Sequence, residues 1–154
     1  MPTYTVEMQS ADEPAELFAA LRAYRSARDA AAQISRDTAD STSHWIVPFR
    51  NGRLEWRQQE SHPAESSDML VSFHQVEGPF AQFAGSWSVA PDAGGALFHY
   101  QLDFRTSVPN WAGAIDRVIG RAVLQAVVDS VSVASTGTAT LTEGAALLTD
   151  IRSI

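Results

Sequence analysis

Glu60 is the residue whose position is most suggestive of chemistry. It follows Leu54, Trp56 and Gln58 at every second position, so the four side chains share one face of a β-strand. Burial among apolar side chains disfavours a charged carboxylate, and this moves its pKa toward the range that suits a general acid or base. Such a group can take a proton from a carbon beside a carbonyl. The alternative is that Glu60 ends its strand in water.

Three neutral polar residues also lie on faces that are otherwise apolar: Gln58, Gln75 and Tyr100. Buried polar groups need hydrogen-bonding partners. The two glutamines are therefore candidates to hold a carbonyl or hydroxyl group of a ligand, and Tyr100 is a candidate donor to a developing enolate oxygen. Glu60, Gln58 and Tyr100 form the expected catalytic set. The alternative is that the glutamines bond each other or the backbone and that Tyr100 belongs to the core.

Large aromatic side chains on the same faces are expected to bind an apolar, flat ligand by stacking. They are Trp45, Trp56, Phe73, Trp87 and Phe98. Trp111, near the start of a later helix, is expected to cover the mouth of the site. The alternative is a filled core, since aromatic side chains at strand spacing usually pack against one another.

Composition removes several kinds of chemistry. The 154 residues include no cysteine, which excludes disulfides, zinc–thiolate sites and thiol nucleophiles, and all 11 basic residues are arginine, which excludes Schiff bases. The histidines show no metal-binding spacing, so no metal site is expected. A net charge of −7 argues against binding to nucleic acid or anionic membranes. Without a secretory pattern or a long apolar run, the protein is expected to be cytoplasmic.

These residues need a sheet to position them, and the sequence supplies one. Residues 3–8 alternate as a short strand, and Asp12-Glu13-Pro14 starts a helix with Asp12 as the expected N-cap. Residues 23–33 are expected to continue as a second short helix. Residues 35–43 are polar and fit either an edge strand or a loop.

From His44 onward the strands are well marked. Asn51-Gly52 is the strongest hairpin signal, and folding about it pairs Phe49 with Leu54, Val47 with Trp56 and Trp45 with Gln58. Further alternating segments surround Phe73, Trp87 and Tyr100. Each has one aromatic and one polar face, which predicts an antiparallel meander covered on one side only.

A long helix then follows, with Asn110 as its expected N-cap and its end near Ala134. Its apolar stripe runs through Trp111, Ile115, Val118, Ile119, Ala122, Ala126 and Val127. The aromatic face of the sheet has only this helix to pack against, so residues 1–134 predict a single α+β domain with a pocket between sheet and helix. Residues 135–154 form a tail of unassigned role, weakly helical around 145–151.

The order of these elements, together with several short sequence motifs, resembles the helix-grip superfamily of START-like (SRPBCC, Bet v 1-like) proteins. Within that superfamily the chain resembles the polyketide cyclase/dehydrase (aromatase/cyclase) family. The motifs are SHWIV at 43–47, GRLEW at 52–56, FHQVEGPF at 73–80, GSWSV at 85–89, DF at 103–104 and VP at 108–109. The resemblance implies a curved antiparallel sheet around a long C-terminal helix, with a deep aromatic-lined cavity to which Trp56 belongs. It also implies a reactive poly-β-ketone ligand and no cofactor.

One departure from that family concerns the strand after Trp56. The best-matched cyclases carry a serine and then an arginine where this chain has Gln58 and Glu60, and no arginine lies on a predicted inward face. Arg117 or Arg121 on the long helix is the candidate substitute for a carbonyl-polarising arginine.

The functional hypothesis is a bacterial enzyme that folds and cyclises a polyketide-type chain, with dehydration, for natural-product biosynthesis. Its partners would be an apolar small molecule and an acyl carrier protein, and the protein itself a monomer or homodimer. The alternatives are a non-catalytic carrier of an apolar molecule and a cyclase for another ring closure, such as a cycloaddition or pyran formation.

Overall fold

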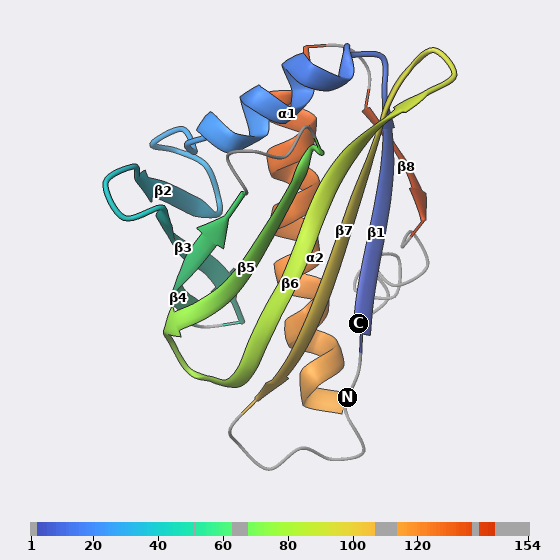
Figure 1. Cartoon of the computed structure of the whole chain (residues 1–154). Coiled ribbons are helices and arrows are strands. Elements are labelled where there is room, and N and C mark those ends of the chain that lie inside the picture. Colours follow the sequence, from blue (N-terminus) through green and yellow to red (C-terminus); the bar gives the residue numbers. More distant parts are fainter. Residues whose placement is uncertain (1–2, 51, 63–67, 107–113, 137–138, 144–154) are drawn as a thin grey trace.

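The structure is a computed structural model that describes residues 3–50, 52–62, 68–106, 114–136 and 139–143. One curved antiparallel sheet holds eight strands in the order β2-β3-β4-β5-β6-β7-β1-β8. Helix α2 runs along the concave side of the sheet, and α1 crosses above it (Figure 1). The elements are β1 (Thr3–Ser10), α1 (Pro14–Ala23), β2 (Gln33–Asp37), β3 (Thr42–Phe49), β4 (Gly52–Ser61), β5 (Leu70–Glu77), β6 (Phe80–Asp92), β7 (Gly95–Thr106), α2 (Ala114–Ala134) and β8 (Ala139–Glu143). The helix-grip architecture expected from the sequence is confirmed.

The core fills the space between the aromatic face of the sheet and α2. The strands β3 to β7 form the predicted meander, and β1 joins it by pairing with β7. Alternate residues along each strand are buried because successive side chains point to opposite faces. Among the most deeply buried side chains are Trp56 and Phe104 from the sheet and Val123 and Leu124 from α2.

The β3–β4 hairpin has a different register from the expected one. Phe49 pairs with Gly52, Val47 with Leu54 and Trp45 with Trp56. The chain therefore reverses between Phe49 and Gly52, and Arg50 adopts a positive φ of 55° that the expected Asn51-Gly52 turn did not assign to it. The error is two residues, and an even shift leaves every side chain on its predicted face.

The segment between α1 and β3 corrects two further expectations. No second helix continues past Ala23; the chain bends and returns as the short edge strand β2. Ser26 and Gln33 hold this segment by side-chain bonds to the backbone, with the Ile34 amide donating to Ser26 Oγ at 2.8 Å and Gln33 Nε2 donating to the Ala30 carbonyl at 2.6 Å. Such local bonds compete with helix formation.

The start of α1 also differs from expectation. Glu13, not Asp12, occupies the N-cap position, and it makes no capping bond through its side chain; Pro14 opens the helix. The Asp12 carboxylate instead accepts hydrogen bonds from the backbone amide and hydroxyl of Thr136, both at 3.0 Å. Asp12 therefore ties the beginning of α1 to the end of α2.

Helix α2 ends at Ala134, as predicted, whereas its expected N-cap Asn110 and the stripe residue Trp111 lie outside the described residues. Ile119, Ala126 and Val127 of the predicted stripe are buried. Within residues 135–154, Ala139–Glu143 forms β8 and pairs with β1. The weak helix expected at 145–151 also falls outside the described residues.

Candidate ligand-binding site

A small hollow lies where α1, α2 and the concave face of the sheet meet. Its lining consists of Leu21, Tyr24, Arg36, Trp45, Gln58, Glu60, Trp87, Phe98, Tyr100, Val127, Ser130 and Val131. Its volume is about 30 Å³, which corresponds to roughly two water molecules. The interior aromatic side chains fill most of the space that the family resemblance assigns to a deep cavity.

Glu60 is the polar centre of this hollow. Its side chain is only 15% exposed, and one carboxylate oxygen, Oε1, accepts a hydrogen bond from Arg36 in an ion pair at 2.5 Å. The other oxygen, Oε2, accepts bonds from Ser43 Oγ and Gln58 Nε2, both at 2.9 Å. Both oxygens are thus held in fixed directions, with Oε1 on the guanidinium.

Two tryptophans support this carboxylate through the residues that bind it. Trp45 Nε1 donates to Ser43 Oγ at 2.9 Å, and Trp56 Nε1 donates to Gln58 Oε1 at 2.8 Å. The indoles stack with centroids 5.5 Å apart and 14° between planes. The strand register produces this symmetry, because Trp45 faces Trp56 and Ser43 faces Gln58 across β3 and β4.

Arg36 corrects the expectation that no strand arginine points inward. It lies on β2 two residues after the buried Ile34, and its side chain is 11% exposed. Besides Glu60 it donates to the carbonyls of Tyr24 (2.7 Å) and Leu21 (3.2 Å) at the end of α1. The helix-borne candidates Arg117 and Arg121 do not line the hollow.

Tyr100 lines the opposite wall. Its ring stacks on Phe73 at 5.4 Å. Burial, together with the nearby Glu60 carboxylate, raises the pKa of its hydroxyl far above the ordinary value. Tyr100 therefore keeps its proton as a neutral hydrogen-bond donor.

The alkaline behaviour of the protein should reveal this burial. Burial is also the main cause that raises the pKa of Tyr4 and of Tyr24 above 10.0. Because the folded protein holds these protons more tightly, these three tyrosines leave the stability unchanged below about pH 10 and lower it above that pH. Above that pH, Tyr100 alone lowers the free energy of unfolding by about 1.4 kcal/mol per pH unit. The part of the tyrosinate absorbance that belongs to Tyr100 should appear only as the chain unfolds, and Tyr100→Phe should flatten the loss of stability. Ordinary titration of all three tyrosines in the folded protein would contradict this expectation.

The predicted site residues divide into three groups. Glu60, Gln58, Tyr100, Trp45, Trp87 and Phe98 line the hollow. Trp56 and Phe73 lie behind these residues, each 2% exposed. Gln75 binds the backbone of Phe80 through both ends of its amide, at 3.0 and 3.1 Å, and so braces the β5–β6 turn away from the hollow. Trp111 lies outside the described residues.

Sequence reasoning missed Arg36, Ser43 and the wall formed by the end of α1. Ser43 stands two residues before Trp45, so extending the alternation of β3 by one step places it inward. Arg36 stands two residues after Ile34, but a five-residue strand with one large apolar side chain gives little periodicity. The described residues contain no cluster of acidic or histidine side chains suited to a metal ion, and none of their helices could span a membrane.

The sheet gripping α2, with this hollow between them, defines a helix-grip protein. The chain belongs to a family described as polyketide cyclase/dehydrase and lipid transport, whose model matches residues 1–136. These activities concern largely apolar small molecules. No curated protein matches the chain by sequence.

Solved structures share this fold at low sequence identity. A protein of Thermus thermophilus is similar with a TM-score of 0.62 and 16% identity, over 86% of this chain and 93% of that one. A START superfamily protein of Mycobacterium smegmatis gives 0.61 and 15%, over 84% and 92%. The Zhui aromatase/cyclase of a Streptomyces species gives 0.54 and 19%, over 98% and 94%. At these identities the likeness concerns the fold.

Proposed function

We propose that this protein binds a polyketide-type chain between sheet and α2 and promotes its cyclisation, with loss of water, in natural-product biosynthesis. The observation that carries the proposal is the oriented Glu60 carboxylate in an aromatic-lined hollow, near the neutral hydroxyl of Tyr100. A carboxylate accepts protons and a neutral phenol donates hydrogen bonds, so one hollow combines both functions needed to form and stabilise an enolate.

The proposed steps use residues of this chain only. Glu60 takes a proton from a methylene carbon between two carbonyls, and the electron pair moves to the neighbouring carbonyl oxygen, which Tyr100 or Gln58 stabilises by donating a hydrogen bond. The carbon then attacks a carbonyl carbon elsewhere in the same chain and forms the ring. The attacked carbonyl oxygen becomes an alkoxide, which takes the proton from Glu60 and becomes a hydroxyl. For dehydration, Glu60 removes a second proton from the attacking carbon and returns it to this hydroxyl, which leaves as water as a carbon–carbon double bond forms. Holding two parts of a flexible chain together supplies several kcal/mol of the rate enhancement.

A second function, stoichiometric binding of an apolar molecule without chemistry, is favoured by a different observation. The hydrogen bonds of Glu60 are made within the protein, and the hollow has room for about two waters. A carrier needs only a core that opens and closes around its ligand. Another ring closure, such as pyran formation, would use the same shape with less need of a base.

A turnover assay tests the enzymatic proposal. A polyketide synthase mixture that makes unreduced poly-β-ketones, on an acyl carrier protein and as released chains, is incubated with a substoichiometric amount of the protein. Mass spectrometry then compares the products with those formed in its absence. A new cyclised or dehydrated product in molar excess over the protein is expected. Capture of the unchanged chain without excess product would favour the carrier.

A further inference from the structure

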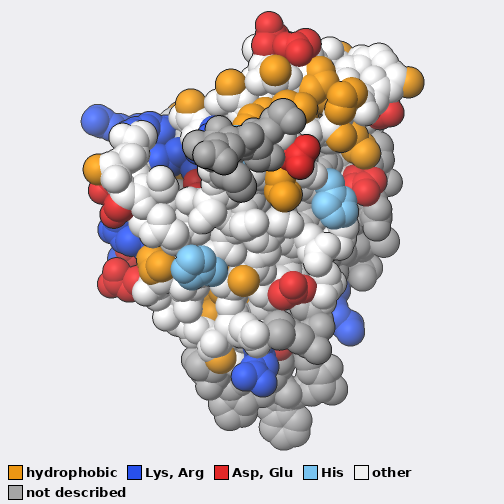
Figure 2. Space-filling view, in the orientation of Figure 1, with side chains coloured by type: hydrophobic (Ala, Val, Ile, Leu, Met, Phe, Trp, Pro, Cys, Tyr) orange, Lys and Arg blue, Asp and Glu red, His pale blue; other side chains and the backbone are white. Residues whose placement is uncertain are grey.

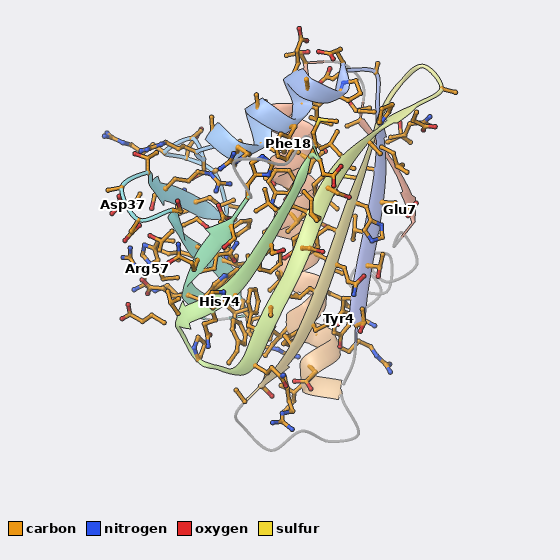
Figure 3. The ribbon with its side chains drawn as sticks, viewed as in Figure 1. Tyr4, Glu7, Phe18, Asp37, Arg57 and His74 are labelled. Carbon is orange, nitrogen blue, oxygen red and sulfur yellow. The ribbon has the colours of Figure 1, made fainter. Side chains whose placement is uncertain are left out.

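A second pocket adjoins the hollow from outside. It has a volume of about 140 Å³ and lies between Arg22 on α1 and the β2–β3 turn, where Asp37 and Thr42 contribute to its wall. Figure 3 shows Asp37 at the outer end of β2, away from α2. Arg36 and Glu60 line both this outer pocket and the inner hollow. Their ion pair is therefore the partition between the two spaces.

The same partition includes the end of α1. Arg36 donates to the carbonyls of Leu21 and Tyr24, and the side chains of these two residues also line the hollow. The guanidinium thus fastens the end of α1 to β2 and, through Glu60, to β4. Releasing Arg36 from Glu60 would detach this wall from β4 while the end of α1 stays bound to β2.

We propose that the Arg36–Glu60 ion pair is a gate to the interior. It opens for an apolar ligand that bears an anionic oxygen, such as a carboxylate or an enolate. The ligand oxygen replaces Glu60 on Arg36 in the outer pocket, and the apolar part of the ligand enters the hollow as the side chains that line it move apart, since the closed hollow has a volume of only about 30 Å³. This inference rests on the proposed function in one respect: a ligand must occupy the hollow.

The charge requirement follows from what each partner keeps when the pair separates. Glu60 retains two donors, Ser43 and Gln58, on its other oxygen. Arg36 retains two backbone carbonyls but has no anion. Because an uncompensated buried charge is costly, separating the pair for a neutral ligand would leave both Arg36 and Glu60 without a counter-charge. An anionic oxygen restores the ion pair, and guanidinium groups bind planar oxygen pairs well.

The residues around this gate are less acidic than the rest of the protein, which favours the approach of an anionic ligand here. Residues 22–42 carry four arginines, Arg22, Arg25, Arg28 and Arg36, against Asp29, Asp37 and Asp40, although the whole chain has a net charge of −7. Figure 2 shows blue side chains gathered beside the end of α1 and β2. These residues sum to +1, and Glu60 brings the balance around the opening to zero, so this region repels an anion less than the rest of the acidic chain does.

Two dyes with the same aromatic rings test the proposal. The anionic 8-anilinonaphthalene-1-sulfonate and the neutral N-phenyl-1-naphthylamine both fluoresce on entering an apolar site, and only the first can bind Arg36 as an anion. Titrations of each dye give its dissociation constant. The native protein is expected to bind the anionic dye more tightly than the neutral one.

The variants separate the contribution of Arg36 from that of Glu60: Glu60→Gln leaves Arg36 without a counter-ion, and the double variant removes both charges. Glu60→Gln, which removes the competing carboxylate, is expected to tighten the anionic dye by about tenfold. Adding Arg36→Gln to Glu60→Gln should weaken that dye by about thirtyfold or more and change the neutral dye little. Adding Arg28→Gln instead removes one positive charge from an exposed residue that lines neither pocket, and should change both dyes little. Near-ultraviolet circular dichroism confirms that each variant is folded.

Each outcome has a distinct meaning. If removal of Arg36 weakens binding of the anionic dye alone, the result supports the Arg36–Glu60 gate and its preference for anionic ligands. Equal binding of both dyes, unaffected by Arg36, overturns the inference and leaves the proposed function standing. If neither dye binds any variant, the interior does not admit a ligand, and both the inference and the proposed function fail.

Discussion

Glu60→Gln is expected to slow product formation by a factor of about 10² to 10⁴, the range that positioned acid–base groups contribute. The amide keeps the shape of the carboxylate and can still accept hydrogen bonds from Ser43 and Gln58, but it cannot take a proton from carbon. The loss should therefore appear in kcat, and the substrate should still bind. Single-turnover mass spectrometry with the poly-β-ketone mixture measures both quantities.

Glu55→Gln is the matched control for this prediction. Glu55 lies on the same strand with its side chain 42% exposed, near His44 and Arg53 rather than near the hollow. It undergoes the same chemical change and should retain the native rate. If Glu60→Gln and Glu55→Gln both turn over at the native rate, Glu60 transfers no proton, and the protein acts by positioning its ligand alone.

Trp56→Ala is expected to lower the free energy of unfolding by about 3–5 kcal/mol, as is usual when a large buried aromatic side chain is truncated. Trp56 is 2% exposed, and its ring contacts Trp45, Phe80 and Phe83. The change leaves a void within this cluster and removes the donor that orients Gln58. Urea unfolding followed by far-ultraviolet circular dichroism measures the loss.

Trp56→Phe separates packing from hydrogen bonding at this position. It keeps an aromatic ring but removes the indole N–H, so its cost should approach that of one unsatisfied buried acceptor, about 1–3 kcal/mol. Val76→Ala, at a residue that is 50% exposed, should change stability by less than about 0.5 kcal/mol. A loss for Trp56→Ala no larger than that of Val76→Ala would show that the aromatic cluster contributes little to the core.

The faces of the strands were predictable because burial on one side imposes a period of two. Trp45, Val47, Leu54 and Trp56 are all buried as expected, even though their pairing differs by two residues from the prediction. The alternation of apolar and polar residues indicates directly which face of the strand a side chain occupies. The register between two strands depends instead on which residues form the turn. Here Phe49 pairs with Gly52 rather than with Leu54, a difference that the alternation of apolar residues does not encode.

The centre of the site was only half predictable for a related reason. Gln58 and Glu60 follow Trp56 in one strand, so their place could be inferred from alternation. The Arg36–Glu60 pair joins residues 24 positions apart in the sequence. Strand β2 is so short and polar that its sequence does not indicate which side chains point inward. The volume of the hollow depends on how completely the facing side chains fill the interior. No periodicity in the sequence specifies this total packing volume.

The pairing of β1 has a consequence for the moment when the protein is made. Strand β1 (Thr3–Ser10) leaves the ribosome well before the strands with which it pairs, β7 (Gly95–Thr106) and β8 (Ala139–Glu143). At about 5–20 residues per second, the segment waits several seconds or longer with its apolar side chains uncovered. An unpaired strand of that kind readily joins another chain. The nascent chain is therefore most vulnerable to aggregation at its N-terminal strand, and this is where a chaperone would protect it most.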